Sequence, residues 1–194
     1  RQTTAQVMAK RVGNTAFTVY TRLGPLPEVG GDPGGFSLDV AGFHAAQAAR
    51  RASWLTGMTS LSTHDTKRGE DARARIAVLA EIPDRWAQAV ARWSARHPGP
   101  DPASEWFLYQ TLVGAHPLPL ERAWPALEKS MREAKTRTSW VRPDEEFEAE
   151  MRALVEALLA DETFVADLDA FVAPLVEPGR VNALSQVALR LFSP

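Results

Sequence analysis

Apolar residues recur at helical spacing through almost the whole sequence after Pro83, and this pattern limits the possible folds more than any other feature. They lie three and four positions apart, as on the buried face of an amphipathic helix. Breaks rich in proline and glycine, such as residues 97–102, divide the region into successive helices. We therefore expect a mainly α protein, with a kink or restart at Pro125, an interruption at Pro174 and a break at residues 178–179. The stripes contain Trp86, Ala89, Val90 and Trp93; Trp106, Leu108, Leu112 and Val113; Leu120, Trp124, Leu127 and Met131; Phe147, Met151, Leu154, Val155 and Leu158; Phe164, Leu168, Phe171, Val172 and Leu175; and Val181, Leu184, Val187 and Leu191.

The first 82 residues are less regular. Residues 2–11 predict a short helix and residues 38–53 a longer one, whereas the glycines and prolines of residues 24–35 predict a loop. Only residues 58–62 (MTSLS) are typical of a strand. Asp65 or Thr66 can then cap a helix that runs to about Ile82.

A lone strand cannot satisfy its own backbone groups. We therefore expect residues 58–62 to pair with sequence outside this chain, to be exposed or to be remodelled. The sequence also does not begin with Met. Both features predict that the chain is a piece of a larger protein.

The composition excludes several classes of function. The 194 residues can bury a substantial core, and a net charge of −2 gives no basic field for nucleic acid. Without cysteine there is neither a disulfide framework nor a thiolate metal site, and no apolar run is long enough to span a bilayer. We expect a cytoplasmic protein with no cofactor, no bound metal, no nucleic-acid partner and no membrane partner.

Residues 64–71 (HDTKRGED) are the main candidate site, because they place an imidazole, carboxylates and two cations where a strand gives way to a helix. In barrel enzymes this rim binds substrate. The Asp65 carboxylate can accept hydrogen bonds from neighbouring sugar hydroxyls and His64 can donate another. Taken alone, these residues favour a plainer interpretation, a capped helix start with solvated charges. Retaining glycosidases need two carboxyl groups about 5–5.5 Å apart, and Asp65, Glu70 and Asp71 are poorly placed to form such a pair.

Other candidates are weaker. The glycine loop of residues 27–33 (PEVGGDP) could bring backbone close to a ligand, although a structural turn is the favoured interpretation. Tryptophans could stack on sugars, but those on helical stripes are predicted to be core residues. Trp54 and Trp140 lie outside clear stripes, and Trp140 is the better candidate for an exposed aromatic. The isolated histidines have no metal-ligand spacing; they are His44, His97 and His116.

Residues 62–75 (STHDTKRGEDARAR) closely resemble a signature segment of the maltooligosyl trehalose synthases, which are members of the α-amylase superfamily, in glycoside hydrolase family 13. This resemblance implies a C-terminal-half piece of a catalytic region, made of helices and a short strand from the last part of a (β/α)8 barrel. Further stretches resemble the family in the same order along nearly the whole chain. They are residues 7–10 (VMAK), 15–17 (TAF), 20, 22–23, 28–33 (EVGGDP), 108–114 (LYQTLVG), 132–135 (REAK), 138–140 (TSW) and 182–186 (NALSQ).

The resemblance implies a (1→4)-α-D-glucan 1-α-D-glucosylmutase of trehalose biosynthesis. Such an enzyme isomerises the reducing-end α-1,4 linkage of a maltooligosaccharide to an α,α-1,1 linkage by retaining, intramolecular transglucosylation. The Asp nucleophile and the Glu acid/base would lie ahead of residue 1, so we expect the chain alone to be inactive and to need the rest of the catalytic domain as its partner. By motif match, Asp65 would stabilise the transition state, His64, Lys67 and Arg68 would bind substrate, and Glu28, Gly30, Gly31 and Asp32 would form a possible substrate loop.

The chain departs from the family at several positions. Gly13 and Asn14 stand where two acidic residues are usual, Thr18 replaces an aromatic residue, Gly69 a serine and His116 a tryptophan. If the acidic pair supports the active site, the parent enzyme is altered or impaired.

The predicted organisation has three parts: a barrel-derived segment (1–82), a helical subdomain (83–180) and a helix that returns to the barrel (181–194). Two other functions stay open. One is a non-catalytic helical module for packing or partner binding, which residues 83–180 support nearly as well. The other is a different α-amylase-type hydrolase or transferase, which would share the His-Asp pair but not the Lys67-Arg68 extension.

Overall fold

The computed structural model describes residues 15, 18–26, 28, 34–35, 37–54, 56–57, 59–64 and 66–193. The helix expected at residues 2–11 lies outside this part of the chain. The elements in chain order are α3 (Val40–Ser53), α4 (Glu70–Ala77), the 3-10 helix η2 (Val78–Glu81), α5 (Pro83–Arg96), α6 (Pro102–Ala115), α7 (Leu120–Ala134), α8 (Glu145–Ala160), α9 (Glu162–Val172), the 3-10 helix η3 (Ala173–Leu175) and α10 (Val176–Phe192).

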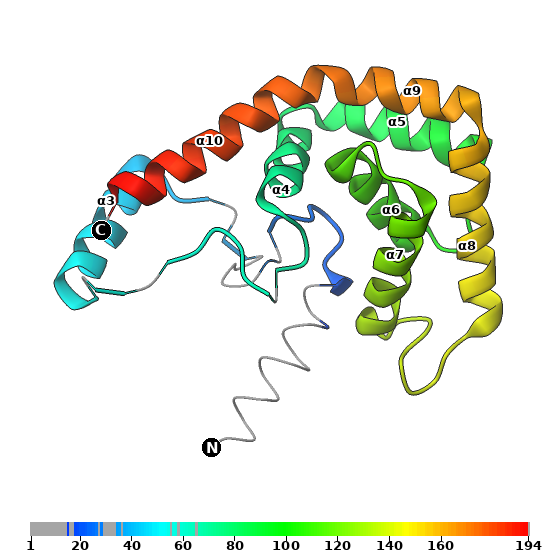
Figure 1. Ribbon diagram of the computed structural model, residues 1–194, viewed down its shortest axis with the longest axis horizontal. Coiled ribbons are helices and arrows are strands. Elements are labelled where there is room, and N and C mark those ends of the chain that lie inside the picture. Colours follow the sequence, from blue (N-terminus) through cyan, green and yellow to red (C-terminus); the bar gives the residue numbers. More distant parts are fainter. Residues whose placement is uncertain are drawn as a thin grey trace.

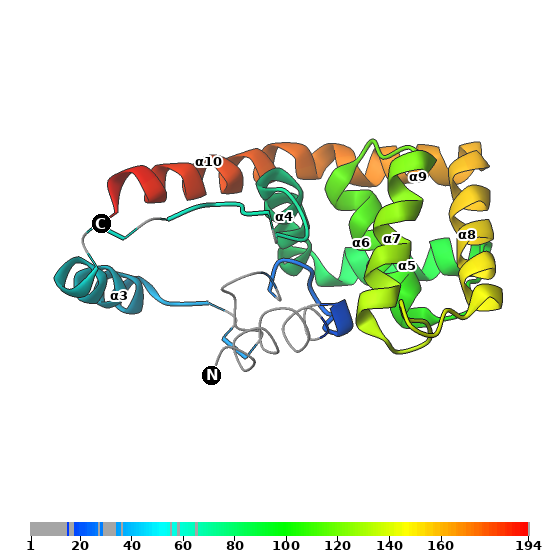
Figure 2. The same ribbon diagram turned by 60° about the horizontal axis from the view of Figure 1, so that its bottom comes forward.

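The helices form one elongated assembly. α9 and α10 run across the top of the molecule, while α4, α6, α7 and α8 descend from them (Figure 1). A second view shows α6 and α7 between α4 and α8, with α3 apart from the other helices (Figure 2). α3 contains no buried residue, which agrees with its separate position.

Four helices, α3, α6, α8 and α9, begin at an aspartate whose side chain caps them. Asp101 accepts a hydrogen bond from the backbone N–H of Ser104 at the start of α6, and Asp144 does the same for Phe147 at the start of α8. Asp161 caps α9 through the N–H groups of Thr163 and Phe164. These carboxylates satisfy backbone donors that the first helical turn leaves unpaired.

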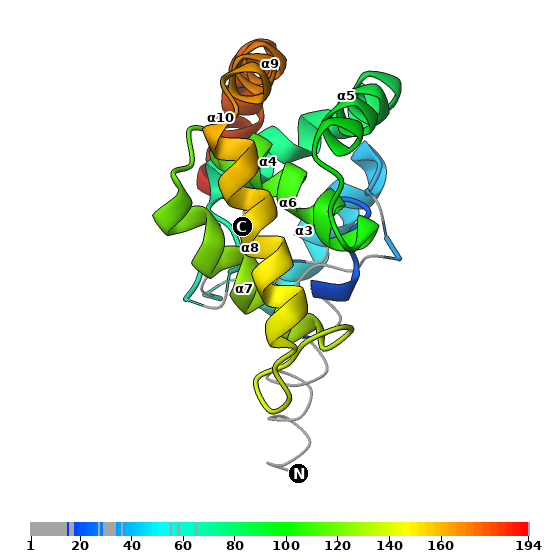
Figure 3. The same cartoon turned by 90° about the vertical axis from the view of Figure 1, so that its right-hand side faces the viewer.

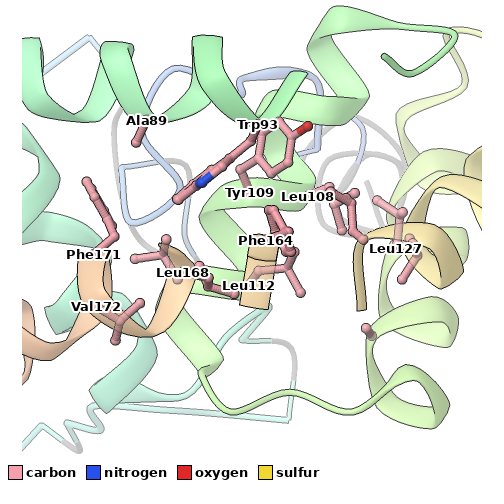
Figure 4. Close-up of a cluster of buried hydrophobic side chains, with 14 of the residues drawn as sticks. Ala89, Trp93, Leu108, Tyr109, Leu112, Leu127, Phe164, Leu168, Phe171 and Val172 are labelled. Carbon is pink, nitrogen blue, oxygen red and sulfur yellow. The ribbon is translucent and has the colours of Figure 1, made fainter. Parts of the chain in front are cut away.

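The core lies among α5, α6, α8 and α9 and is built around aromatic rings (Figure 4). The Trp93 ring lies 5.4 Å from the rings of Tyr109 and Phe171 and 5.6 Å from that of Phe164, mostly edge to face. Its indole N–H donates to Asp167 at 2.6 Å, so the buried polar atom is satisfied. Viewed from the α8 end, α5 and α9 lie apart at the top of the molecule (Figure 3). Ring contacts from Trp93 of α5 to Phe164 and Phe171 of α9 join the two helices. The helical stripes of the sequence predicted Trp93, Phe164 and Phe171 as core residues but not Tyr109, and the last predicted stripe (Val181, Leu184, Val187 and Leu191) is exposed.

α4 is held between α6 and α10 by two close approaches. A Cβ on Gly114 of α6 would lie 2.6 Å from Ile76, and one on Gly179 of α10 would lie 3.2 Å from the backbone of Arg75. Asn182 of α10 donates to the carbonyl of Ala74 at 3.3 Å. Both glycines therefore let a neighbouring helix reach the backbone of α4.

Three predictions about secondary structure were wrong. Residues 59–62 form no strand, and no strand occurs elsewhere in the described residues, so nothing there could pair with one. The helix expected to start at Asp65 or Thr66 starts at Glu70, with Gly69 as its N-cap. No break occurs at residues 178–179, because α10 begins at Val176 and Pro178 lies in its first turn, where its missing N–H costs no helical hydrogen bond.

Other expectations about helix continuity were met in part. α7 continues through Pro125 without restarting, whereas η3 interrupts the path of α9 into α10 at Pro174, as expected. Among the residues described, no helix has the length and apolar character needed to cross a membrane.

Candidate functional site before the start of α4

The His-Asp motif lies in a tight turn just ahead of α4. The backbone N–H of Thr66 donates to the carbonyl of Thr63 at 3.1 Å, and the Thr66 hydroxyl accepts from the N–H of Thr63 at 2.7 Å. His64 lies within this turn with an exposed side chain. Asp65, which follows it, lies outside the described residues. The turn thus presents the imidazole to the surface and fixes the backbone on either side of the motif.

The motif is tied to the first part of the chain through Glu28. This carboxylate is 5% exposed, and both of its oxygens accept a hydrogen bond from the backbone N–H of Lys67, at 3.0 and 3.1 Å. A buried carboxylate needs such partners. Glu28 was predicted as part of a possible substrate loop. In the structure its carboxylate holds the backbone of the site segment, and its companions Gly30, Gly31 and Asp32 fall outside the described part of the chain.

Arg68 points back against α6. One terminal nitrogen donates to the Thr111 hydroxyl at 3.2 Å, and the guanidinium carbon lies 4.5 Å from the centre of the Phe107 ring. Burial lowers the pKa of the guanidinium to about 10, an effect that the negative charge of Glu28 partly opposes. Arg68 therefore stays protonated at neutral pH, and its charge is shared between a carboxylate, a hydroxyl and an aromatic face.

Residues 59–62 are fastened to the first turns of α4. Ser62 donates its hydroxyl proton to Glu70, and Arg73 donates to the carbonyl of Leu61 and, at 3.1 Å, to Ser62. The hydrogen bond from Ser62 is the main reason that the pKa of Glu70 lies below its usual value, with Arg73 adding to it. Glu70 is thus engaged in holding the segment before the helix.

A second line of contacts joins residues 21–24 to α6. The side chain of Gln110 is almost fully buried, at 1% exposure, and it accepts from the N–H of Gly24 and donates to the carbonyl of Thr21, both at 2.7 Å. The prediction did not include Gln110, Thr111 or Phe107 in the site. A signal was present, because Gln110 is a polar residue within the apolar run of residues 108–114.

The structure therefore brings four of the predicted residues into one neighbourhood: His64, Lys67, Arg68 and Glu28. Gln110, Thr111 and Phe107 of α6 form its floor. Chemically, the arrangement can offer an exposed imidazole beside a fixed backbone turn, with a permanent positive charge behind it. Such a surface can exchange hydrogen bonds with polar groups of a ligand.

No protein-family model matches the chain. A protein of Mycobacterium tuberculosis strain H37Rv, whose name assigns it to the maltooligosyl trehalose synthases, is 38% identical over 201 residues, which cover all of this chain and 26% of that protein. The solved structure of maltooligosyltrehalose synthase from Arthrobacter ramosus is similar with a TM-score of 0.95 and 40% identity, again over all of this chain and 26% of that one.

A more distant solved structure agrees. The Sulfolobus tokodaii protein, described as a hypothetical maltooligosyl trehalose synthase, has a TM-score of 0.90 and 36% identity over 97% of this chain and 27% of its own. The chain spans about a quarter of the length of the relatives that it matches. It is therefore homologous, along its whole length, to one segment of the maltooligosyl trehalose synthases.

Proposed function

We propose that this chain is the segment of a maltooligosyl trehalose synthase that carries the transition-state-stabilising aspartate. The enzyme would convert the reducing-end α-1,4 linkage of a maltooligosaccharide into an α,α-1,1 linkage. The similarity of the whole chain to the Arthrobacter ramosus enzyme, at a TM-score of 0.95, is the observation that carries the proposal. The intact HDTKR motif at residues 64–68 supports it.

Each predicted site residue receives a role in this proposal. Asp65 stabilises the positive charge that develops on the reacting sugar, and His64 donates a hydrogen bond to a hydroxyl of the same sugar. Lys67 contacts the reducing-end glucose. Arg68 shapes that subsite from behind, because its guanidinium contacts Phe107 and Thr111 of α6. The glycine loop (Glu28, Gly30, Gly31 and Asp32) closes the subsite, and the Glu28 contact to Lys67 holds the two segments together.

The proposed reaction needs two further carboxyl groups, because a retaining mechanism uses a nucleophile and an acid/base on either side of the glycosidic bond. We place both groups in other parts of the enzyme. In the same proposal, residues 1–82 belong to the catalytic barrel, residues 83–180 form a helical subdomain, and residues 181–194 return to the barrel. The released glucose must also stay in place and present its anomeric hydroxyl. A pocket that excludes water would favour this transfer over hydrolysis.

The first test is the activity of the 194-residue chain itself. Incubated with maltopentaose, it is expected to leave the number of reducing ends unchanged, because it lacks the nucleophile and the acid/base. Chromatography for a non-reducing product checks this. Turnover by the isolated chain would disprove the assignment of those two groups to another segment.

The second test transplants the chain into an active enzyme. A chimera in which this chain replaces the corresponding quarter of the Arthrobacter ramosus enzyme is expected to turn maltopentaose into a product without a reducing end. Asp65→Asn in the chimera should lower kcat about 1000-fold or more, since it removes charge stabilisation made in the transition state. Asp71→Asn, six residues further along, is the matched control and should leave kcat within about twofold.

The same assay separates the alternatives. A mutase lowers the number of reducing ends, an α-amylase-type hydrolase raises it, and a non-catalytic packing module leaves a chimera whose activity does not depend on Asp65. Equal activity of the Asp65→Asn and unchanged chimeras would reject the proposed role.

A further inference from the structure

The loop between α7 and α8, residues 135–144, exposes a large aromatic side chain that the proposed site does not use. Trp140 is 56% exposed, and the next residue, Val141, is 89% exposed. Trp86 and Trp93, by contrast, are buried in the core. An exposed tryptophan on a loop is an informative exception, because burial of an indole is strongly favourable.

This loop is firmly built at its base. The Glu148 carboxylate, 7% exposed, accepts two hydrogen bonds from Arg132, at 2.8 and 2.6 Å, and one from the Thr138 hydroxyl at 2.5 Å. The Thr138 hydroxyl also accepts from the N–H of Asp144 at 3.0 Å. These bonds join the end of α7, the loop and the start of α8, so the loop has a defined shape before any ligand arrives.

The same network orients the indole. The Arg132 guanidinium carbon lies 4.9 Å from the centre of the Trp140 ring, in a cation–π contact. Because Glu148 fixes Arg132 with two hydrogen bonds, the cation holds the ring on one side. Trp140 is 56% exposed, so about half of its surface stays accessible.

The surroundings of Trp140 suit a sugar. Residues 135–145 line an open hollow of about 1100 Å³, slightly above the 300–1,000 Å³ that is typical of ligand pockets. The axial C–H groups of a pyranose ring stack on an indole face, and the side chains of Ser139 and Arg142 beside the ring carry hydrogen-bonding groups for hydroxyls. The Arg142 N–H donates to the Ser139 hydroxyl at 3.0 Å, which keeps this edge of the loop in place.

The loop also lies on the side of the molecule that carries the motif. In Figure 1 it hangs below α7 and α8, on the same side of the helices as the segment before α4 and as residues 18–26. A small cavity is lined by Thr18 and Thr21 of that segment together with Thr136 and Arg137 of the loop. The buried Gln110 side chain binds Thr21 and Gly24, and Gly24 lies close to Arg68, so residues 21–24 lie between this cavity and Arg68.

We propose that Trp140, with Ser139 and Arg142, forms a stacking platform for glucose units of an α-1,4-glucan away from the bond that reacts. The choice of ligand rests on the proposed function. The platform would bind longer maltooligosaccharides better than short ones, because only longer chains reach it from the motif.

Nuclear magnetic resonance of the ¹⁵N-labelled 194-residue chain tests the platform, with the indole N–H signals of its tryptophans as reporters. Maltoheptaose is expected to shift the Trp140 signal along a saturating curve, with a dissociation constant on the order of 1 mM. A β-1,4-linked glucan of similar length should shift it little. Trp54, which is 73% exposed but belongs to no built network, is the internal control and should not shift. The Trp140 signal is assigned as the one that is missing from the spectrum of Trp140→Phe or Trp140→Ala. One folded variant is enough for this assignment.

The outcomes are distinct. A Trp140 signal that stays unchanged at saturating maltoheptaose would overturn the platform and favour a surface that packs against another part of the enzyme. Equal shifts of Trp140 and Trp54 would also overturn it, because they would indicate non-specific stacking.

The chimera with Trp140→Ala separates this inference from the proposed function. Loss of the platform should raise KM for maltoheptaose several-fold and leave KM for maltotriose unchanged. The variant should still form the non-reducing product. An unchanged KM for maltoheptaose would count against the platform, whereas an inactive chimera with the unchanged chain would count against the proposed function alone.

Discussion

Arg68 shows how a residue can belong to the proposed site motif while facing away from its surface. Its guanidinium stacks on Phe107 and donates to Thr111, so the side chain connects the motif to α6. With a pKa of about 10, it carries its charge throughout the neutral range. Arginine suits this position better than lysine, because a planar guanidinium can stack and hydrogen-bond at once.

Arg68→Lys should therefore impair catalysis without removing a charge. In the chimera we expect kcat to fall about 10- to 100-fold, since small misplacements of a catalytic turn have effects of this size. KM for maltopentaose should change less, because the side chain does not touch the substrate in the proposed role. Steady-state kinetics give both constants. Arg180→Lys, at an exposed position on α10, is the control and should behave like the unchanged chimera. A raised KM at constant kcat would show direct substrate contact by Arg68.

Glu148 controls stability at acid pH. The hydrogen bonds from Arg132, and then from Thr138, place the pKa of Glu148 below its ordinary value in the folded chain. Its contribution is thus complete above the pKa of an unfolded glutamate, about 4.3, and is lost as the pH falls through the lower, folded-state pKa.

Glu148→Gln is expected to lower the free energy of unfolding by about 1–3 kcal/mol at pH 7, because it weakens charged hydrogen bonds in a buried position. The difference from the unchanged chain should shrink as the pH is lowered below about 4. Urea titrations at several pH values measure this. Glu156→Gln removes an exposed i,i+4 pair with Arg152 and should cost less than about 0.5 kcal/mol. A difference for Glu148→Gln that is independent of pH would contradict the proposed linkage.

At the scale of elements, the sequence predicted helices well where their apolar faces are continuous. The cores of α5, α8 and α9 follow directly from stripes such as Trp86–Ala89–Trp93, since the spacing alone places these residues on one face. The strand prediction for residues 59–62 was wrong. A β-prone sequence forms a strand only where it can pair within a sheet, and the described residues contain no neighbouring strand.

The first residue of α4 and the continuity of α10 could not be predicted from the neighbouring sequence either. Gly69 is a weak cap by sequence, whereas the contacts of Ser62 and Arg73 that fix the preceding segment come from folding. Gly179 looks like a helix breaker, yet it lies within α10. Glycine suits this position because a side chain there would meet the backbone of Arg75. For the site, the motif located His64, Lys67 and Arg68, but their floor on α6 depends on contacts between distant residues.

Gly114→Val should separate α6 from α4. A Cβ at this position would already lie 2.6 Å from Ile76 and 3.2 Å from the carbonyl of Ala72, so the larger side chain must push the helices apart. We expect a loss of about 2–3 kcal/mol in the free energy of unfolding, measured by urea denaturation. Ala115→Val, on the exposed side of the same helix, reports the helix propensity alone and should cost about 0.5 kcal/mol. Equal effects of the two variants would mean that the close approach does not matter for stability.

On the scale of the whole molecule, stability and exposure are unevenly distributed. The aromatic core lies among α5, α6 and α9, whereas the start of α3 with the residues just before it, and α10 from Val181 onward, expose large apolar side chains. The exposed ones include Leu38, Val40, Val181, Leu184, Leu191 and Phe192.

Trp93→Leu should destabilise the whole molecule, because Trp93 contacts rings from two other helices, α6 and α9, and its indole N–H binds Asp167. We expect a loss of about 3 kcal/mol or more, from the cavity and from the lost hydrogen bond, while Asp167 keeps its ion pair with Arg92. Thermal unfolding followed by circular dichroism measures it as a lower Tm. Trp54→Leu, at an exposed position, should leave Tm nearly unchanged. A core that tolerates Trp93→Leu would indicate that α5 and α9 do not fold as one unit.

The position of α4 between Gly114 and Gly179 also bears on the order of folding. α4 has eight residues, and a helix so short is not stable alone in water. It can persist only once α6 and α10, whose glycines lie 65 residues apart in the chain, have both come together around it. The turn that carries His64 is fastened to α4 by Ser62 and Arg73 and gains its shape at the same moment. We therefore expect the turn that carries His64 to be among the last parts of the chain to become ordered, after the helices that surround it have packed.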